Sequence, residues 1–253
     1  MTRFISRYPI AFSILAVFLA VVVIKLLDAG LTYLKWPDLA RQLMVETVLC
    51  GYVIFLLTRL RWWQEAGFQS PATWRKLLAG LPLLLLPVIV VTSSGFKSSS
   101  ASQMIGFAIL TLMVGFAEEG LLRGVVLRAM LPIGVIRATV LSSVFFGIGH
   151  LLNILQGAAP AATIIQMIYS ILLGIGFAGV RLYTGSIWPA IVIHTLIDFV
   201  DIGSRGFVLA PPQSLTLAGI IAPVVLTGLY ALYGWWLLRR TTKSNRRLTS
   251  GSS

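Results

Sequence analysis

Two adjacent glutamates, Glu118 and Glu119, lie in the middle of a long apolar stretch, and Arg123 follows one helical turn later. An ionisable side chain in hydrocarbon is costly to bury, so residues of this kind are candidates for a functional site. The chain has only two histidines, His150 and His194, and each lies in a further apolar segment. Carboxyl and imidazole groups brought together from separate segments could carry out general acid–base chemistry.

The spacing of these residues indicates which of them share a helix face. Glu119 and Arg123 are four residues apart, so an ion pair between them would lower the cost of burying both. Glu118 points about 100° away from Glu119 on the same helix and is free for another role. His194 and Asp198 are also one turn apart, so both can face the same cavity.

Each of these residues also has a purely structural interpretation. The Glu119–Arg123 pair could be a bridge that fixes the fold, and Asp198 could serve only to support His194. A single intramembrane histidine is often a hydrogen-bonded packing residue. The joint occurrence of two glutamates and two histidines in apolar segments favours a shared site over this interpretation.

The composition predicts an all-α, polytopic integral membrane protein. Of the 253 residues, 57% are hydrophobic and 11% are charged, whereas soluble domains carry about a quarter of charged residues. One soluble core of this length could not bury so much apolar surface. The net charge of +12 comes mainly from basic residues at the ends of apolar runs, where they anchor helices. This distribution argues against nucleic-acid binding.

About eight apolar segments have a length suited to crossing a membrane, and they predict one helical bundle over residues 1–238. The tail, 239–253, is basic and then Ser/Gly-rich, and is expected to be disordered. The segment 59–76 mixes tryptophans with charges and is expected to rest at the membrane interface. The expected spans are 9–27, 42–58, 77–95, 103–127, 137–156, 161–183, 187–202 and 215–238.

The distribution of basic residues predicts an orientation and a common depth for the candidate residues. Most Lys and Arg residues outside the spans fall on the side of the two termini, which places both termini in the cytoplasm. Glu118, His150 and His194 then lie roughly 15, 20 and 10 Å from the inner ends of their spans. The short loops favour a bacterial cytoplasmic membrane.

This set of residues suggests amide hydrolysis inside the membrane. Glu118 and His150 could activate a water molecule, while His194 and Asp198 hold the developing oxyanion. The sequence has no Gly-x-Ser-x-Gly in a span and no His-Glu-x-x-His, which other hydrolases use. No cofactor is expected, although a divalent metal such as zinc could be bound by Glu118, His150 and His194.

Three motifs occur in order over about residues 103–202. Glu118-Glu119-Gly-Leu-Leu-Arg123 matches EExxxR, Phe146-Gly-Ile-Gly-His150 matches FxxxH, and His194-Thr-Leu-Ile-Asp198 matches HxxxN/D. Together they resemble the CPBP intramembrane proteases, a family of CAAX proteases and bacteriocin-processing enzymes formerly called Abi. This family includes the type II CAAX prenyl endopeptidases.

The resemblance implies a role for each motif residue. It implies that Glu118 activates water with His150 as its partner, and that His194 acts on the oxyanion side. It implies that Glu119 and Arg123 form the pair that supports the site. Phe146, one turn before His150, and Asn153, three residues after it, are further expected supporting residues by their spacing.

Asp198 stands where the eukaryotic-type prenyl proteases have asparagine. An ionised aspartate cannot donate a hydrogen bond to an oxyanion, so Asp198 either orients His194 or stays protonated. Members of the family have been described both as metalloproteases and as metal-free, glutamate-dependent enzymes. The missing zinc motif favours the metal-free description.

The expected substrate is a membrane-embedded or lipidated protein or peptide, and the motifs leave open whether it is prenylated. Two further functions fit the same residues. In a proton-coupled transporter or channel, Glu118, His150 and His194 would relay protons, although no inverted repeat is visible. A catalytically silent scaffold of the same family would act only by binding a partner.

Overall fold

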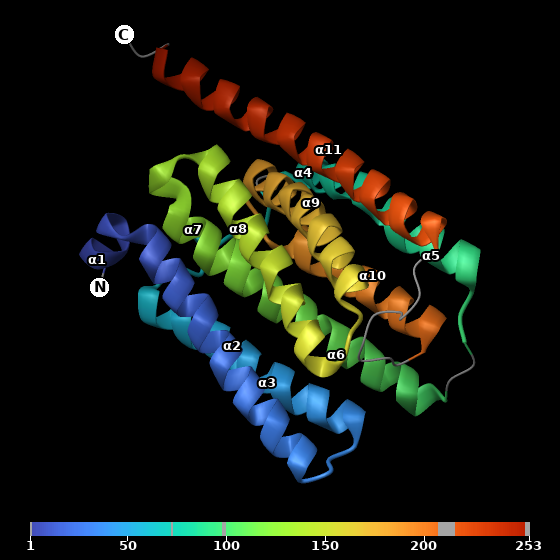
Figure 1. Ribbon diagram of the computed structural model, residues 1–253. Coiled ribbons are helices and arrows are strands. Elements are labelled where there is room, and N and C mark those ends of the chain that lie inside the picture. The colour runs from blue at the N-terminus through green and yellow to red at the C-terminus, as the bar shows by residue number, and fades with distance from the viewer. Residues whose placement is uncertain (1, 72, 98–99, 207–215, 251–253) are drawn as a thin grey trace.

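The computed structural model describes residues 2–71, 73–97, 100–206 and 216–250. These residues form helices and connecting turns with no β-strand, which confirms the predicted all-α class (Figure 1). In order, the elements are α1 (Thr2–Arg7), α2 (Pro9–Tyr33), α3 (Asp38–Leu60), α4 (Trp74–Leu77), η1 (Leu78–Leu84), α5 (Leu85–Ser94), α6 (Ala101–Glu119), η2 (Gly120–Val126), α7 (Leu127–Met130), η3 (Leu131–Ile133), α8 (Val135–Gly149), η4 (His150–Gln156), α9 (Pro160–Thr184), α10 (Trp188–Arg205) and α11 (Leu217–Ser250).

The protein is a multi-pass integral membrane protein. Among the described residues, seven helical segments are long and apolar enough to cross a membrane. The predicted span 187–202 corresponds to α10, which is not one of the seven. It carries Asp198, Asp201 and Arg205 within its 18 residues. The seven segments are Pro9–Tyr33, Asp38–Leu60, Trp74–Ser94, Ala101–Ile133, Val135–Gln156, Pro160–Thr184 and Gly219–Thr241.

Local sequence signals set the helix ends around the candidate residues. α6 begins with a capping box, in which the Ser100 side chain accepts from the Gln103 backbone and the Gln103 side chain accepts in return. α10 has Pro189 in its first turn, where proline is well tolerated because the amide hydrogen that it lacks would have no partner within the helix. α9 ends at Gly185, whose φ of 73° suits glycine.

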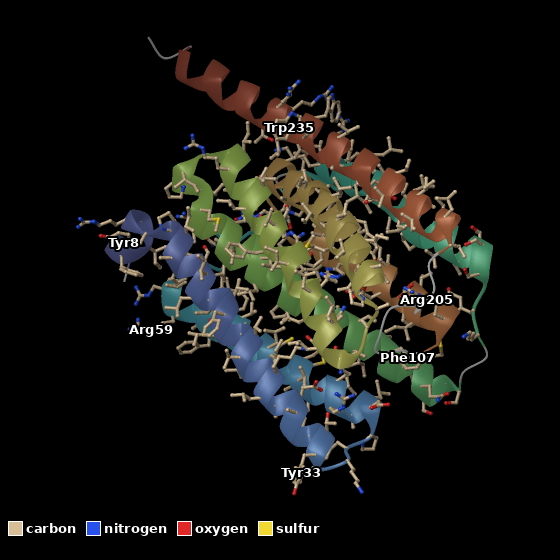
Figure 2. All side chains as sticks on the ribbon, viewed as in Figure 1. Tyr8, Tyr33, Arg59, Phe107, Arg205 and Trp235 are labelled. Carbon is tan, nitrogen blue, oxygen red and sulfur yellow. The ribbon has the colours of Figure 1, made fainter. Side chains whose placement is uncertain are left out.

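The helices that carry the three motifs lie in the centre of the bundle. α6 packs against α3 on one side and α10 on another, and α9 packs against α8 and α11. The α2–α3 hairpin and α11 form opposite outer faces (Figure 1). Both termini lie at the same end of the molecule (Figure 1). Tyr8 and Arg59 are near that end, whereas Tyr33 and Arg205 lie at the other (Figure 2).

The structure shows the course of two further predicted segments. α11 continues to Ser250, beyond the predicted limit at 238, because no glycine or proline interrupts the chain before Gly251. Residues 251–253 of the predicted disordered tail lie outside the described residues. The segment 59–76 packs into the bundle as well as facing outward. Trp62 and Ala66 are buried, and the Ile187 backbone N–H donates to Gly67.

The backbones of α9 and α11 meet at a pair of glycines. A Cβ atom added to Gly179 would lie 2.4 Å from Gly234 Cα and 2.5 Å from its carbonyl oxygen. Small residues of this kind let membrane helices approach closely. The contact between α9 and α11 therefore depends on both residues being glycine.

Substituting Gly179→Ala is expected to force α9 and α11 apart and to destabilise the protein by about 1–3 kcal/mol. The matched control is Gly228→Ala in α11, where an added Cβ meets nothing within 4 Å. This control should be neutral or stabilising by up to about 1 kcal/mol, because alanine is the better helix former. Reversible unfolding of the purified variants in detergent would measure both. Equal stability of the two variants would contradict the close packing of α9 on α11.

Candidate active site

The two glutamates lie where the helix geometry changes. Glu118 and Glu119 end α6, and the chain continues as the π-helix η2, of which every residue is buried. The sequence predicted a continuous span over 103–127. π-helical turns widen a helix locally and occur often at functional sites. Gly120 allows this turn to lie against α3, because an added Cβ would be 2.7 Å from the Val53 side chain.

The predicted ion pair between Glu119 and Arg123 is present. Arg123 Nη1 donates to Glu119 Oε1 at 2.9 Å, and both side chains are fully buried. The guanidinium also lies over two aromatic rings, with its Cζ 4.4 Å from the Phe146 centroid and 5.5 Å from that of Phe177. Such cation–π contacts add to the stability of a charge that has no access to water.

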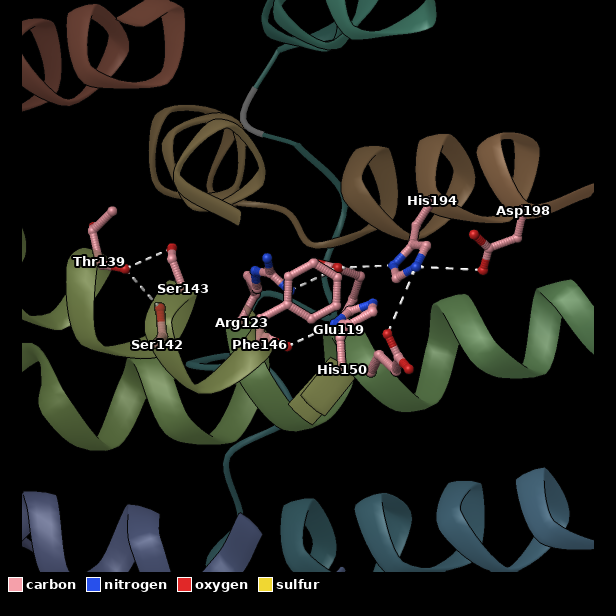
Figure 3. A network of polar contacts seen from close by, with 10 residues as sticks. Glu119, Arg123, Thr139, Ser142, Ser143, Phe146, His150, His194 and Asp198 are labelled. Carbon is pink, nitrogen blue, oxygen red and sulfur yellow. Dashed lines mark hydrogen bonds and ion pairs between the residues drawn. The ribbon is translucent and has the colours of Figure 1, made fainter. Parts of the chain in front are cut away.

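His194 joins α10 to this pair. Its Nδ1 is 3.0 Å from Glu119 Oε1. Its ring stacks on Phe177 and meets the edge of Phe146, each at 5.7 Å between centroids. Because Glu119 already accepts from Arg123, the carboxylate is the acceptor again and His194 carries its proton on Nδ1. Figure 3 shows Glu119 between Arg123 and His194.

The other ring nitrogen of His194 faces two further carboxyl groups. Nε2 lies 3.4 Å from Asp198 Oδ2 and 3.7 Å from Glu118 Oε2. The side chains of Glu118 and Asp198 keep 34% and 31% of their surface exposed, whereas Glu119 keeps none. The site therefore has a sealed half around Glu119 and a more exposed half around Glu118 and Asp198.

His150 lies at the junction of α8 and η4, and Phe146 links it to the cluster. Its Nδ1 contacts the Phe146 carbonyl oxygen at 3.0 Å, so Nδ1 donates and Nε2 remains available as an acceptor. The Phe146 ring contacts both histidines, with centroid distances of 5.1 Å to His150 and 5.7 Å to His194. Asn153 instead donates to Gln166 at 3.1 Å and ties η4 to α9.

A metal site in this cluster would need several ligands from its carboxyl and imidazole groups. Within the described residues, no group of three or more His, Cys, Asp or Glu side chains is arranged to hold a metal ion. Glu118 and His194 approach each other, but Nδ1 of His150 is directed to a backbone carbonyl. The set Glu118, His150 and His194 would have to rearrange to bind zinc with tetrahedral geometry.

Glu46 on α3 was not among the predicted site residues. Its Oε2 atom is buried without a hydrogen-bond partner. The carboxyl group lies close enough to Glu118, Asp198 and His194 for their charges to interact. No motif marks this residue. The signal that could have found it is an acidic residue inside the apolar span 42–58.

The shared burial of Glu119 and Arg123 predicts strong coupling between them. Removing one partner, as in Glu119→Gln or Arg123→Met, leaves the other buried and uncompensated, and is expected to cost about 3–5 kcal/mol. The double variant should lose clearly less than the sum of the two single losses. Unfolding of the four proteins in detergent measures this double-mutant cycle. Losses that add to within about 0.5 kcal/mol would contradict the pairing.

No curated protein and no solved structure matches the chain. A family model does match, over residues 100–200, and its description is Type II CAAX prenyl endopeptidase Rce1-like. The matched residues include all three motifs and the cluster built from α6, α8 and α10. Over this region the chain is similar to the Rce1-like type II CAAX prenyl endopeptidases.

Proposed function

We propose that the protein is an intramembrane endopeptidase that hydrolyses a peptide bond of a membrane-associated or lipidated protein or peptide. The observation that carries this proposal is the approach of Glu118, Glu119 and Asp198 to the single ring of His194. Glu119 holds the ring from the sealed side through Nδ1, and Glu118 and Asp198 lie near Nε2 on the more exposed side. This arrangement separates the sealed half of the site, which supports the His194 ring, from the more exposed half, where the proposed reaction takes place.

Glu118 is the proposed general base. Its exposed carboxylate can take a proton from a water molecule, whose oxygen then attacks the carbonyl carbon of the substrate. His150 is the proposed second partner of that water, because Nε2 remains an acceptor while Nδ1 donates to Phe146. Glu118 then passes the proton to the leaving nitrogen, so the peptide C–N bond breaks and no further acid is needed.

His194 is the proposed donor to the oxyanion. The contact with Glu119 holds the ring in place through Nδ1. When the ring carries a second proton, Nε2–H can donate to the negative oxygen of the tetrahedral intermediate. Asp198 lies 3.4 Å from the same nitrogen, and we propose that it keeps Nε2–H oriented until the substrate carbonyl enters.

We propose that both termini face the cytoplasm of a bacterial cell. The excess of basic residues on that side and the position of both termini at one end of the bundle support this orientation. In this orientation the cluster lies within the membrane-spanning helices, and its substrate would be a segment held in or at the bilayer.

The substitution Glu118→Gln keeps the size of the side chain but removes the proposed general base. Cleavage is therefore expected to fall by roughly 10²–10⁴-fold. His150→Ala should lower cleavage similarly. Comparing the membrane proteomes of cells that express the wild type or Glu118→Gln would identify proteins shortened only by the wild type. One of these substrates would then be co-expressed with each variant.

The matched control is Glu65→Gln, which removes a half-exposed surface carboxylate paired with Arg128. It should cleave at the wild-type rate, because a surface ion pair contributes little. Wild-type processing by Glu118→Gln or His150→Ala would rule out the roles given to these residues.

Metal dependence is testable with the same substrate. If the site is metal-free, as the missing zinc motif favours, treatment with a strong chelator should leave cleavage unchanged. Elemental analysis of the purified protein should then find no stoichiometric divalent metal. Stoichiometric metal, together with activity that chelation removes and zinc restores, would show a metalloendopeptidase instead.

A further inference from the structure

Glu46 is a fourth carboxyl group at the site and comes from a helix that carries none of the three motifs. Four of the chain's eight acidic residues gather here, namely Glu46, Glu118, Glu119 and Asp198. Among the described residues, Arg123 is the one Lys or Arg side chain that forms an ion pair with any of the four. Arg123 is committed to Glu119, so the open half of the site has an excess of acid.

The packing of α3 places Glu46 on the face that contacts α6. Leu39 of α3 lies against Gly106, Cys50 donates to the Met113 carbonyl oxygen at 3.5 Å, and Val53 lies against Gly120. Glu46 follows Leu39 by seven residues and precedes Cys50 by four and Val53 by seven. This spacing puts Glu46 on the same stripe of α3. It therefore points toward the helix that carries Glu118.

The unpartnered oxygen of Glu46 needs a hydrogen-bond donor. Oε2 is buried and has no partner in the described protein. Leaving a buried acceptor without a donor costs free energy, most of all for a charged group. Glu119 Oε2 is also buried without a partner, but Glu119 is already held through Oε1 by Arg123 and His194. Asp198 and Glu118 both face His194 Nε2. Among the described residues, Glu46 is therefore the carboxyl group of the four that has no hydrogen bond or ion pair and is left for a ligand.

The hydrolysis proposed above creates a donor that matches this acceptor. Water adds across the C–N bond, so its oxygen goes to the carbonyl carbon and a proton goes to nitrogen. The products are a carboxylate and an amine, which gains a further proton and becomes an ammonium group at neutral pH. An ammonium ion is a strong donor to carboxylates, whereas the product carboxylate is repelled by them.

The arrangement of the helices supports assigning this group to one side of the scissile bond. The oxyanion partner, His194, lies on α10, and Glu46 lies on α3. Both helices pack against α6, which carries Glu118. We propose that Glu46 is a substrate-binding residue for the amine side of the scissile bond and holds the ammonium group that cleavage creates, an inference that rests on the proposed function.

The test compares the affinities of two ligands that differ by acetylation of one amine, which removes its positive charge. L-Leucinamide carries a free ammonium group, and N-acetyl-L-leucinamide is its neutral counterpart. Binding of each to the purified full-length protein in detergent would be measured by ligand-detected NMR. The wild type is expected to bind leucinamide about tenfold or more tightly than the acetylated form. Glu46→Gln should bring this ratio close to one, and the Glu65→Gln control should keep it.

A wild type that binds both ligands equally would overturn the proposal, as would a folded Glu46→Gln variant that keeps the preference. If Glu46→Gln does not fold, Glu46→Asp takes its place and should lower the ratio, because its carboxylate is one methylene further away. The binding test needs no turnover. Proteolysis without an ammonium preference would contradict this inference alone, and an ammonium preference without proteolysis would contradict only the proposed reaction.

Discussion

Inside a bundle of membrane helices, the Glu119 carboxylate has to find its counter-charges within the protein, because neither lipid nor a sealed core can solvate it. Its partners are Arg123, one turn further along the chain, and Nδ1 of His194 on α10. Both contact the same oxygen atom, Glu119 Oε1. The local ion pair keeps the charge in place, and the histidine contact ties α6 to α10. The position of Nε2, and with it the reacting half of the site, follows from this one shared oxygen.

Close helix packing makes the shared contact feasible. An added Cβ at Gly115 would lie 2.6 Å from Thr195 Oγ1, so glycine lets α6 approach α10 next to the cluster. An added Cβ at Gly174 would lie 2.8 Å from Arg123 Nη2, so glycine in α9 makes room for the guanidinium. Phe146 and Phe177 fill the remaining space around the charge. Small residues bring the backbones together, and aromatic rings then shield the ions from water and lipid.

The sequence predicted the parts of this site that depend on short-range spacing. The Glu119–Arg123 pair follows from helix periodicity, and so does the approach of Asp198 to His194. The motifs also led to the family whose model matches residues 100–200. The contact between His194 and Glu119 was not predicted, because it joins helices that are 75 residues apart in the chain. Periodicity within a helix cannot indicate which neighbour that helix will meet.

Three further features were not predicted from the sequence. The π-helix after Glu119 depends on how tightly Gly120 packs against α3, which is a tertiary contact. Glu46 has no motif around it, so only the fold brings it to the cluster. The extension of α11 to Ser250 was not predicted, because the basic and Ser/Gly-rich composition of 239–253 favours disorder, although no helix breaker occurs before Gly251. Tertiary packing decided each of the first two cases, and helix propensity decided the third.

The shared oxygen of Glu119 can be observed directly because the chain has only two histidines. Nitrogen NMR of the protein labelled with 15N-histidine, purified without a histidine tag, should give signals from two imidazole rings, and His150→Gln assigns them. One ring, His194, is expected to carry a hydrogen-bonded proton on Nδ1, and Glu119→Gln should shift that signal while leaving His150 nearly unchanged. A His194 signal that does not respond to Glu119→Gln would show that the two helices are not joined at this point.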